Sequence, residues 1–293
     1  MKIEEWDEYK HFISAINEAL DNISSSPAMA KIAGHVFNAG GKKLRPLIIM
    51  LSCGANGGDY KDATRACLAI EGIHTASLVH DDILDEGTMR RNQQTVHEKY
   101  GNMAAILCGD FLIARAIEWM SIYDSRIIWD FGHSGVLLAE GEVIDAGIKR
   151  GEMTIDEYMD CIYKKTAALF EISAKIGARI ALPDDEEAVA KFGRFGYEFG
   201  MAYQIIDDLL EDFGFYKDKE SGVLSDSLYS IYLRSMRFED AAKETIGVAE
   251  SYLRRAKAEL ESVPASDAKD KLIGLTDYID SLMDSVRNAP AQI

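Results

Sequence analysis

The chain has 293 residues, of which 47% are hydrophobic, and this is enough sequence to bury a sizeable core. Its formal net charge is −17, so nucleic acid and anionic membrane surfaces are poor partners for it. The four cysteines are dispersed, without CxxC spacing, which predicts buried free thiols in a reducing compartment. An acidic, polar N-terminus and the lack of a long apolar run predict a cytoplasmic protein without signal peptide or stable membrane insertion.

An all-helical protein is predicted along the whole chain, because only 5 prolines occur and alternating β-branched runs are few. Apolar periodicity predicts helices over residues 6–24, 29–37, 45–56, 60–85, 95–123, 126–148, 155–180, 186–213, 227–236, 238–260 and 266–287. Asp184, with Glu187 in the capping-box position, and Ser266 are predicted N-caps. No break between the helices is long enough to be a domain linker, so a single all-α bundle over residues 1–293 is expected.

The first basic element is the segment 40–46, Gly-Gly-Lys-Lys-Leu-Arg-Pro. Glycines such as Gly41 allow close backbone approach, and Lys42 and Arg45, three residues apart, can converge on one anion. The spacing is not that of a P-loop. An ordinary turn between two helices is the alternative interpretation.

Two acidic clusters interrupt otherwise apolar helical stretches. The first comprises Asp81, Asp82 and Asp85, and the second comprises Asp207, Asp208 and Glu211. Residues four apart lie on one helical face, so each cluster forms a short ladder of carboxylates. Burial of such ladders without counter-charge is costly, which predicts bound Mg²⁺, with Mn²⁺ as a substitute, reaching out to substrate phosphates. Two solvated acidic faces are the alternative.

Basic and polar residues accompany these clusters. His74 lies two turns before Asp81 on the same face. The pair Arg90 and Arg91 suits the oxygens of a diphosphate, or else forms salt bridges with nearby acids. Lys165, in an apolar stretch, either extends to the surface or meets an anion. Gln204 precedes the second cluster and can offer an amide oxygen to an electron-poor centre.

The chain resembles the trans-type isoprenyl diphosphate synthases, the polyprenyl synthetase family. The resemblance rests on motifs that follow one another in the family's order over nearly the whole chain. They are GGKxxRP at 40–46, HxxxxxHDDxxD at 74–85, RR at 90–91, GD at 109–110, KT at 165–166 and YQxxDD at 203–208. The resemblance implies an isoprenoid-synthase helical bundle with a central substrate cavity.

The activity implied by the resemblance is head-to-tail condensation of isopentenyl diphosphate with an allylic diphosphate, farnesyl or geranylgeranyl. Mg²⁺ between the two clusters, with Arg90 and Lys165, would hold the allylic diphosphate. Residues implied for isopentenyl diphosphate are Gly41, Lys42, Arg45, His74 and Arg91. Thr166 and Gln204 would stabilise the allylic cation by their dipoles, and the released diphosphate would accept the final proton.

The chain departs from the family pattern at and after the second cluster. Glu211 stands where the usual member has Asp, and the usual lysine motif downstream is altered. Lys219 or Lys217 is the candidate for its first lysine, whereas Ser225 or Asp226 occupies the place of the second. A weakly catalytic or regulatory subunit of a heteromeric synthase is therefore an alternative, and a terpene cyclase on the same fold is another.

The product is expected to be of medium to long chain. In the family the residues one to two turns before the first cluster form the floor of the chain-length pocket. Here they are the small Ala76 and Ser77, with Ile73 a turn further, which predicts a product from geranylfarnesyl to heptaprenyl diphosphate. Close helix packing is the alternative reason for the small residues. The family also implies a homodimer, for which residues 104–119 are either an interface or a core helix.

Overall fold

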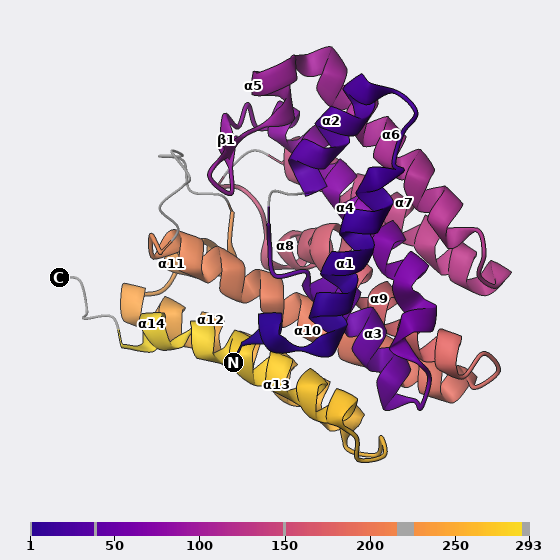
Figure 1. The fold of residues 1–293 in the computed structure, drawn as a ribbon. Coiled ribbons are helices and arrows are strands. Elements are labelled where there is room, and N and C mark those ends of the chain that lie inside the picture. The colour runs from indigo at the N-terminus through magenta and orange to yellow at the C-terminus, as the bar shows by residue number, and fades with distance from the viewer. Residues whose placement is uncertain (1, 38–39, 149–150, 216–225, 289–293) are drawn as a thin grey trace.

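The computed structural model describes residues 2–37, 40–148, 151–215 and 226–288, and most of them lie in helices (Figure 1). The first half comprises 3-10 turn η1 (Ile3–Glu5), α1 (Asp7–Asp21), α2 (Pro27–Phe37), α3 (Leu44–Ala55), 3-10 turn η2 (Tyr60–Ala63), α4 (Thr64–Leu84), β1 (Met89–Arg90), β2 (Gln93–Gln94), α5 (Val96–Tyr100), α6 (Asn102–Met120) and α7 (Ser125–Gly147). The second half comprises α8 (Ile155–Ile162), π-helical turn η3 (Tyr163–Ala167), α9 (Ala168–Ala181), α10 (Glu186–Asp212), α11 (Leu228–Leu233), α12 (Phe238–Leu260), α13 (Asp267–Leu282) and α14 (Asp284–Arg287). The predicted all-α fold is confirmed.

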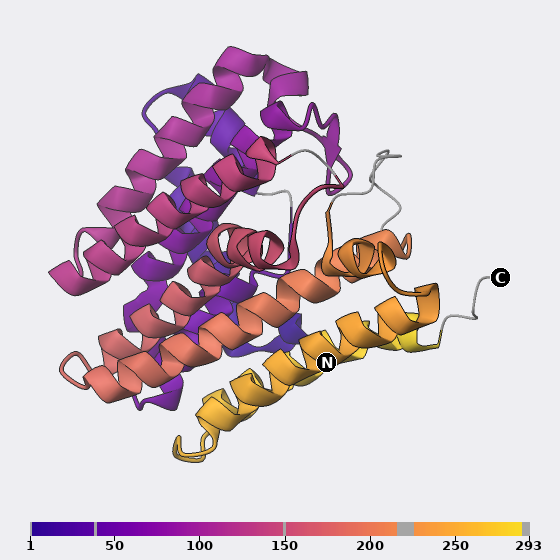
Figure 2. The ribbon, with the colours of Figure 1, turned by 180° about the vertical axis from the view of Figure 1, so that it is seen from behind.

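The bundle is built around the two helices that carry the acidic clusters. Helix α4 packs between α6 and α3, and α10 packs between α9 and α12, while α3 and α9 contact each other. Figures 1 and 2 show α12 and α13 along one side of the molecule and α6 and α7 side by side on another. Helix α3 contributes to the cores on both sides, through Leu47 and Leu51 on one and Ile49 and Met50 on the other. The packing of α3 and α9 therefore connects the two acidic helices rigidly.

The predicted helix ends are partly right. Ser266 caps α13 as predicted, since its Oγ accepts a hydrogen bond from the Lys269 amide at 3.2 Å. The prediction of Asp184 as N-cap of α10 is wrong: the neighbouring Asp185 accepts from the Ala188 amide at 2.9 Å. The predicted helix 95–123 is divided at Gly101, whose φ of +87° ends α5 and begins α6.

Two local structures near the candidate site were not predicted. Residues 89–94 form a two-stranded antiparallel hairpin, in which Arg90 pairs with Gln93. Its central residues Arg91 and Asn92 have φ of 51° and 63°, as a type I′ turn requires. The predicted helix 155–180 contains the π-helical turn η3, and such turns are frequent at functional sites. Within the described residues, no helix combines the length and apolar character needed to cross a membrane.

Candidate active site

The first acidic cluster lies at the C-terminal end of α4. Asp82 is buried and its Oδ1 accepts a hydrogen bond from Arg90 Nε at 2.7 Å. Asp85, the C-cap residue, is exposed. Burial, followed by the negative charge of Glu142, raises the pKa of Asp81 to about 7, and the charges of Lys165 and Arg90 partly offset this rise. The excess of negative charge at the end of α4 favours a cation there.

Lys165 faces this cluster from the π-helical turn. Its Nζ lies 2.9 Å from Glu142 Oε2 and 2.6 Å from Asp145 Oδ2, both on α7. Helix α7 approaches closely at Gly141, where an added Cβ would lie 2.8 Å from the Lys165 backbone nitrogen. Sequence reasoning missed these two acids; their spacing of three residues on one helical face was the available signal.

The second cluster is connected to the same turn through a chain of hydrogen bonds. Thr166 Oγ1 donates to Gln204 Oε1 at 2.7 Å, and Gln204 Nε2 donates to Asp208 Oδ1 at 2.7 Å. The phenol of the fully buried Tyr158 donates to the other carboxylate oxygen of Asp208 at 2.6 Å. Burial raises the pKa of Asp208 to about 7, and the hydrogen bonds from Tyr158 and Gln204 limit the rise. Lys165 and Thr166 are consecutive residues of the π-helical turn. Lys165 acts electrostatically on Asp81 in the first cluster, and Thr166 is linked through Gln204 to Asp208 in the second.

The residues implied for isopentenyl diphosphate gather between α3, α4 and the hairpin. Arg45 Nη1 lies 3.3 Å from His74 Nε2, and the Arg45 guanidinium stacks 4.4 Å from the Phe170 ring centroid. Burial and then the charge of Arg45 lower the pKa of His74 well below its ordinary value, so its imidazole is neutral and accepts from Arg45. Within the described part of the chain, the buried Nε of Arg45 has no hydrogen-bond partner. A buried cation with one unsatisfied N–H is suited to an anionic ligand.

The glycine-rich segment is held against the hairpin by Arg91. Its Nη1 donates to the Gly40 carbonyl at 2.6 Å, and a Cβ on Gly41 would lie 2.6 Å from the same nitrogen. Only glycine therefore fits at position 41, which also has φ +108°. A buried ion pair that sequence reasoning missed, Lys43 Nζ to Glu71 Oε1 at 2.8 Å, anchors the segment to α4. Lys42 remains exposed, with Nζ 4.9 Å from the ring centroid of Tyr278.

The three residues predicted for the chain-length pocket differ in exposure. Ala76 is 1% exposed and lies in the core. Ser77 and Ile73 are only partly buried; the Ser77 hydroxyl donates to the His74 carbonyl at 2.9 Å. A central cavity beside α4 stays a prediction; two pockets of the described residues lie elsewhere, one against α2, β2 and α5 and one against α9 and α10.

The donor set fits Mg²⁺ bound together with substrate. No group of three Asp, Glu, His or Cys side chains in the described residues is arranged to hold a metal ion by itself. Mg²⁺ usually takes only one or two carboxylates and completes its octahedron with water and phosphate oxygens. The hard carboxylate oxygens of Asp81 and Asp208 fit that requirement. Lys217 and Lys219 lie outside the described residues.

The fold and the two acidic clusters describe a helical bundle with a candidate metal site, and comparison with known proteins identifies its family. The family model of polyprenyl synthetase matches residues 26–229. A geranylfarnesyl diphosphate synthase of Methanosarcina mazei is 43% identical over 279 residues, which are 95% of this chain and 94% of that protein. The chain belongs to the polyprenyl synthetase family and is a trans-prenyltransferase.

Solved structures give the same assignment. The crystal structure of a geranyltranstransferase from Methanosarcina mazei aligns with a TM-score of 0.83 at 40% identity, over 96% of this chain and 99% of that one. A geranylgeranyl pyrophosphate synthetase from the archaeon Geoglobus acetivorans aligns with a TM-score of 0.86 at 31% identity, over the same shares. The predicted isoprenoid-synthase fold is confirmed.

Proposed function

We propose that the enzyme condenses isopentenyl diphosphate head-to-tail onto an allylic diphosphate, farnesyl or geranylgeranyl, and releases an all-trans polyprenyl diphosphate. The observation that supports this most strongly is the position of Lys165 and Thr166 between the acidic clusters. Lys165 lies within electrostatic reach of Asp81, and Thr166 is hydrogen-bonded through Gln204 to Asp208. A cationic side chain and a dipolar one therefore flank the place where the clusters would hold a diphosphate.

Each group then has one task. Mg²⁺, bound by the two clusters, would supply positive charge to the diphosphate oxygens as the allylic C–O bond breaks and the leaving group takes the electron pair. Lys165 and Arg90 would add charge to the same oxygens once they exchange their carboxylate partners for the ligand. Arg45, Arg91 and Lys42 would hold isopentenyl diphosphate so that its double bond forms the new C–C bond.

The remaining steps need dipoles and a proton acceptor. Thr166 Oγ1 uses its hydrogen for Gln204, so its lone pairs are directed away from that bond and can stabilise a cation. The neutral His74 would orient Arg45 rather than exchange a proton. The proton lost when the new double bond forms would pass to the departed diphosphate, the strongest nearby base that the proposed site supplies.

A relative that is 43% identical supports a product of 25 carbons or more, since it is a geranylfarnesyl diphosphate synthase. In this chain Ser77 and Ile73, which keep exposed surface on α4, are the better candidates for the pocket floor. Neither carries an aromatic ring that would block the growing chain. We therefore place the product between geranylfarnesyl and heptaprenyl diphosphate.

Incubation of purified protein with Mg²⁺, isopentenyl diphosphate and, separately, geranyl, farnesyl or geranylgeranyl diphosphate tests the proposal. Longer prenyl diphosphates support it. An absence of turnover with every primer contradicts it in favour of a regulatory subunit. A hydrocarbon formed from the primer alone contradicts it in favour of a cyclase.

We also propose that the enzyme is a homodimer joined through α6 and α7. Large apolar side chains are exposed on both helices, which lie side by side in Figures 1 and 2. They are Met103, Ile106, Leu107, Ile113 and Ile117 on α6, and Ile128, Trp129, Val136 and Val143 on α7. A patch of this kind usually marks a protein interface, and a second copy supplies a matching apolar face by symmetry. The opposite face of α6 forms core, so the core-helix interpretation of residues 104–119 is correct for that face, and the interface interpretation stays a proposal for the exposed face.

Light scattering after size exclusion tests the dimer. Wild type should have twice the mass of the chain, and a Leu107→Glu, Trp129→Glu variant should have the mass of one chain, with unchanged circular dichroism. A Phe215→Glu, Phe238→Glu variant, which alters exposed apolar residues elsewhere, is the matched control and should remain dimeric. A monomeric wild type would contradict the assignment.

The cytoplasm is the proposed location. All four cysteines are buried free thiols, as predicted from their spacing. Such thiols fit a reducing compartment, and the proposed substrates are small charged diphosphates. Fractionation of cells would test this placement, with recovery in the soluble fraction expected.

A further inference from the structure

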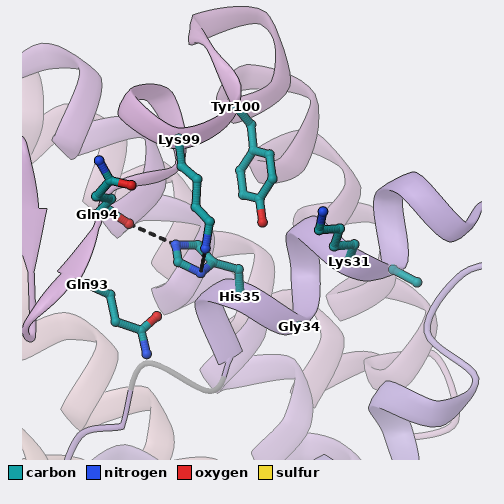
Figure 3. Close-up of a pocket in the computed structure, with 8 residues that line it drawn as sticks. Lys31, Gly34, His35, Gln93, Gln94, Lys99 and Tyr100 are labelled. Atoms are coloured by element: carbon teal, nitrogen blue, oxygen red, sulfur yellow. Dashed lines mark hydrogen bonds between the residues drawn. The ribbon is translucent and has the colours of Figure 1, made fainter.

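An open pocket of about 590 Å³ lies on the outer side of the hairpin, between α2, β2 and α5 (Figure 3). Its polar lining consists of Lys31 and His35 from α2, Gln93 and Gln94 from β2, and Lys99 and Tyr100 from α5. None of these residues belongs to the motifs that define the proposed reaction. No carboxylate lines the pocket, although the whole chain carries a net charge of −17. The pocket is therefore a local concentration of positive charge.

Two ammonium groups are arranged around one aromatic ring. Lys99 Nζ lies 5.5 Å and Lys31 Nζ 6.0 Å from the ring centroid of Tyr100. Figure 3 shows the Tyr100 ring between the two lysine side chains. Because no carboxylate among the described residues lines this pocket, neither lysine is neutralised by an ion pair within it. Both cations are thus available to a ligand from solution.

His35 fixes the position of Lys99. Its Nε2 lies 2.8 Å from the Gln94 carbonyl oxygen, and its Nδ1 lies 3.2 Å from Lys99 Nζ. A carbonyl oxygen can only accept and an ammonium can only donate, so Nε2 carries the hydrogen and Nδ1 accepts. One N–H of Lys99 is used in this way, and its other two remain for a ligand. The lysine is therefore held by an uncharged partner that does not compete for an anion.

We propose that this pocket is a second, metal-independent binding site for a diphosphate group. Two cations on either side of a ring match a ligand with two anionic centres better than a single small anion. The lack of lining carboxylates leaves nothing to hold Mg²⁺, so the ammonium groups would contact the oxygens directly. The preference for diphosphate among oxyanions rests on the proposed function, which releases inorganic diphosphate and uses isopentenyl diphosphate.

The pocket is connected to the candidate active site through the hairpin. The Gln94 carbonyl binds His35, while Gln93 pairs with Arg90 across the hairpin. Arg90 donates to Asp82, and Arg91, at the turn, donates to the Gly40 carbonyl. A ligand on Lys99 would therefore lie next to the strand pair that carries both arginines.

Calorimetric titration in EDTA, which removes metal-dependent binding at the acidic clusters, tests the proposal by comparing variants of the pocket. Wild type should bind inorganic diphosphate at a site that is weakened about tenfold or more in a Lys31→Gln, Lys99→Gln variant, because two charge-assisted contacts are lost. A Lys61→Gln, Lys243→Gln variant removes the same charge from exposed positions elsewhere and should bind as wild type does. The Arg91→Gln variant, which is altered in the proposed substrate site, should still bind diphosphate in the second pocket.

The same titrations with isopentenyl diphosphate and orthophosphate, made in an Arg45→Gln, Arg91→Gln variant that disables the proposed isopentenyl diphosphate site, identify the source of the group. Tighter binding of inorganic diphosphate assigns the site to released product, and tighter binding of isopentenyl diphosphate assigns it to a prenyl headgroup; both support a diphosphate site. Equal affinity for orthophosphate, or unchanged binding in the Lys31→Gln, Lys99→Gln variant, overturns it. Since the readout is binding without metal or turnover, a failure of the proposed function would not affect the result.

Discussion

The phenol of Tyr158 and the carboxylate of Asp208 form a partly buried hydrogen bond of 2.6 Å between α8 and α10. Gln204 donates to the second oxygen of the same carboxylate. Both donors orient Asp208, so its remaining lone pairs are presented in one direction. Mutation of a group that orients a metal-binding carboxylate in this way typically lowers the metal affinity or the activity by about 10- to 100-fold.

Tyr158→Phe should raise the Mg²⁺ concentration needed for half-maximal activity by about 10- to 100-fold, because Asp208 loses one of its two orienting donors. Excess Mg²⁺ should restore much of the rate. Tyr163→Phe is the matched control: its hydroxyl donates to Glu171 at 3.2 Å, away from the second cluster, and its Mg²⁺ dependence should equal that of wild type. If the Tyr158→Phe variant needs the same Mg²⁺ concentration as wild type, Tyr158 does not orient Asp208 for metal binding.

Asp81→Ala should lower kcat by about 10³-fold or more, since the lost interaction strengthens as the diphosphate departs. Addition of EDTA to wild type should abolish turnover. The exposed Asp270→Ala on α13 provides a control with the same change of charge and should retain the wild-type rate. Steady-state assays with labelled isopentenyl diphosphate measure all three; a normal rate for Asp81→Ala would exclude the proposed metal chemistry.

Ser77→Phe should shorten the product while leaving ionisation of the primer intact, because an aromatic ring would occupy the proposed pocket floor. Ser77→Ala removes the hydroxyl without adding volume, so its product length should match wild type. Ala76→Phe is a poorer test, since Ala76 is 1% exposed and overpacking of a core costs about 1–3 kcal/mol. Chromatography of the dephosphorylated products decides; an unchanged chain length in Ser77→Phe would show that the floor lies elsewhere.

The thiols should resist alkylation in the folded protein. Burial raises the pKa of Cys108 to about 11 and those of Cys53 and Cys161 to about 12. An unfolded thiol ionises near pH 8.5, so at pH 9 the unfolded chain holds reactive thiolates while the folded chain does not. Mass spectrometry after iodoacetamide at pH 9 should find native protein largely unmodified and denatured protein modified at all four cysteines. Equal rates in the two states would contradict the buried positions.

The sequence predicted the helical fold and the thiols, because apolar periodicity and cysteine spacing are local signals. It could not predict the π-helical turn at Lys165, since residues 155–180 have the pattern of one continuous helix. The turn is defined by tertiary contacts, among them the approach of α7 at Gly141.

The hairpin was missed for a similar reason. The turn residues Arg91 and Asn92 are not the Asn-Gly or Asp-Gly pair that usually marks a type I′ turn. Arg91 adopts a left-handed conformation that costs a non-glycine residue about 1 kcal/mol or more, and its hydrogen bond to Gly40 helps to hold it there. The Lys43–Glu71 pair and the acids Glu142 and Asp145 likewise follow from packing between helices, which no single segment encodes.

The reaction proposed for this enzyme is the addition of five-carbon units from isopentenyl diphosphate to an allylic primer. The most direct measurement is mass spectrometry of the prenyl alcohols formed from farnesyl diphosphate and fully ¹³C-labelled isopentenyl diphosphate with Mg²⁺, after phosphatase treatment. The product should contain one unlabelled farnesyl unit followed by two or more labelled five-carbon units, and no such product should form in EDTA. Recovery of farnesol alone, or of an unlabelled hydrocarbon, would contradict it.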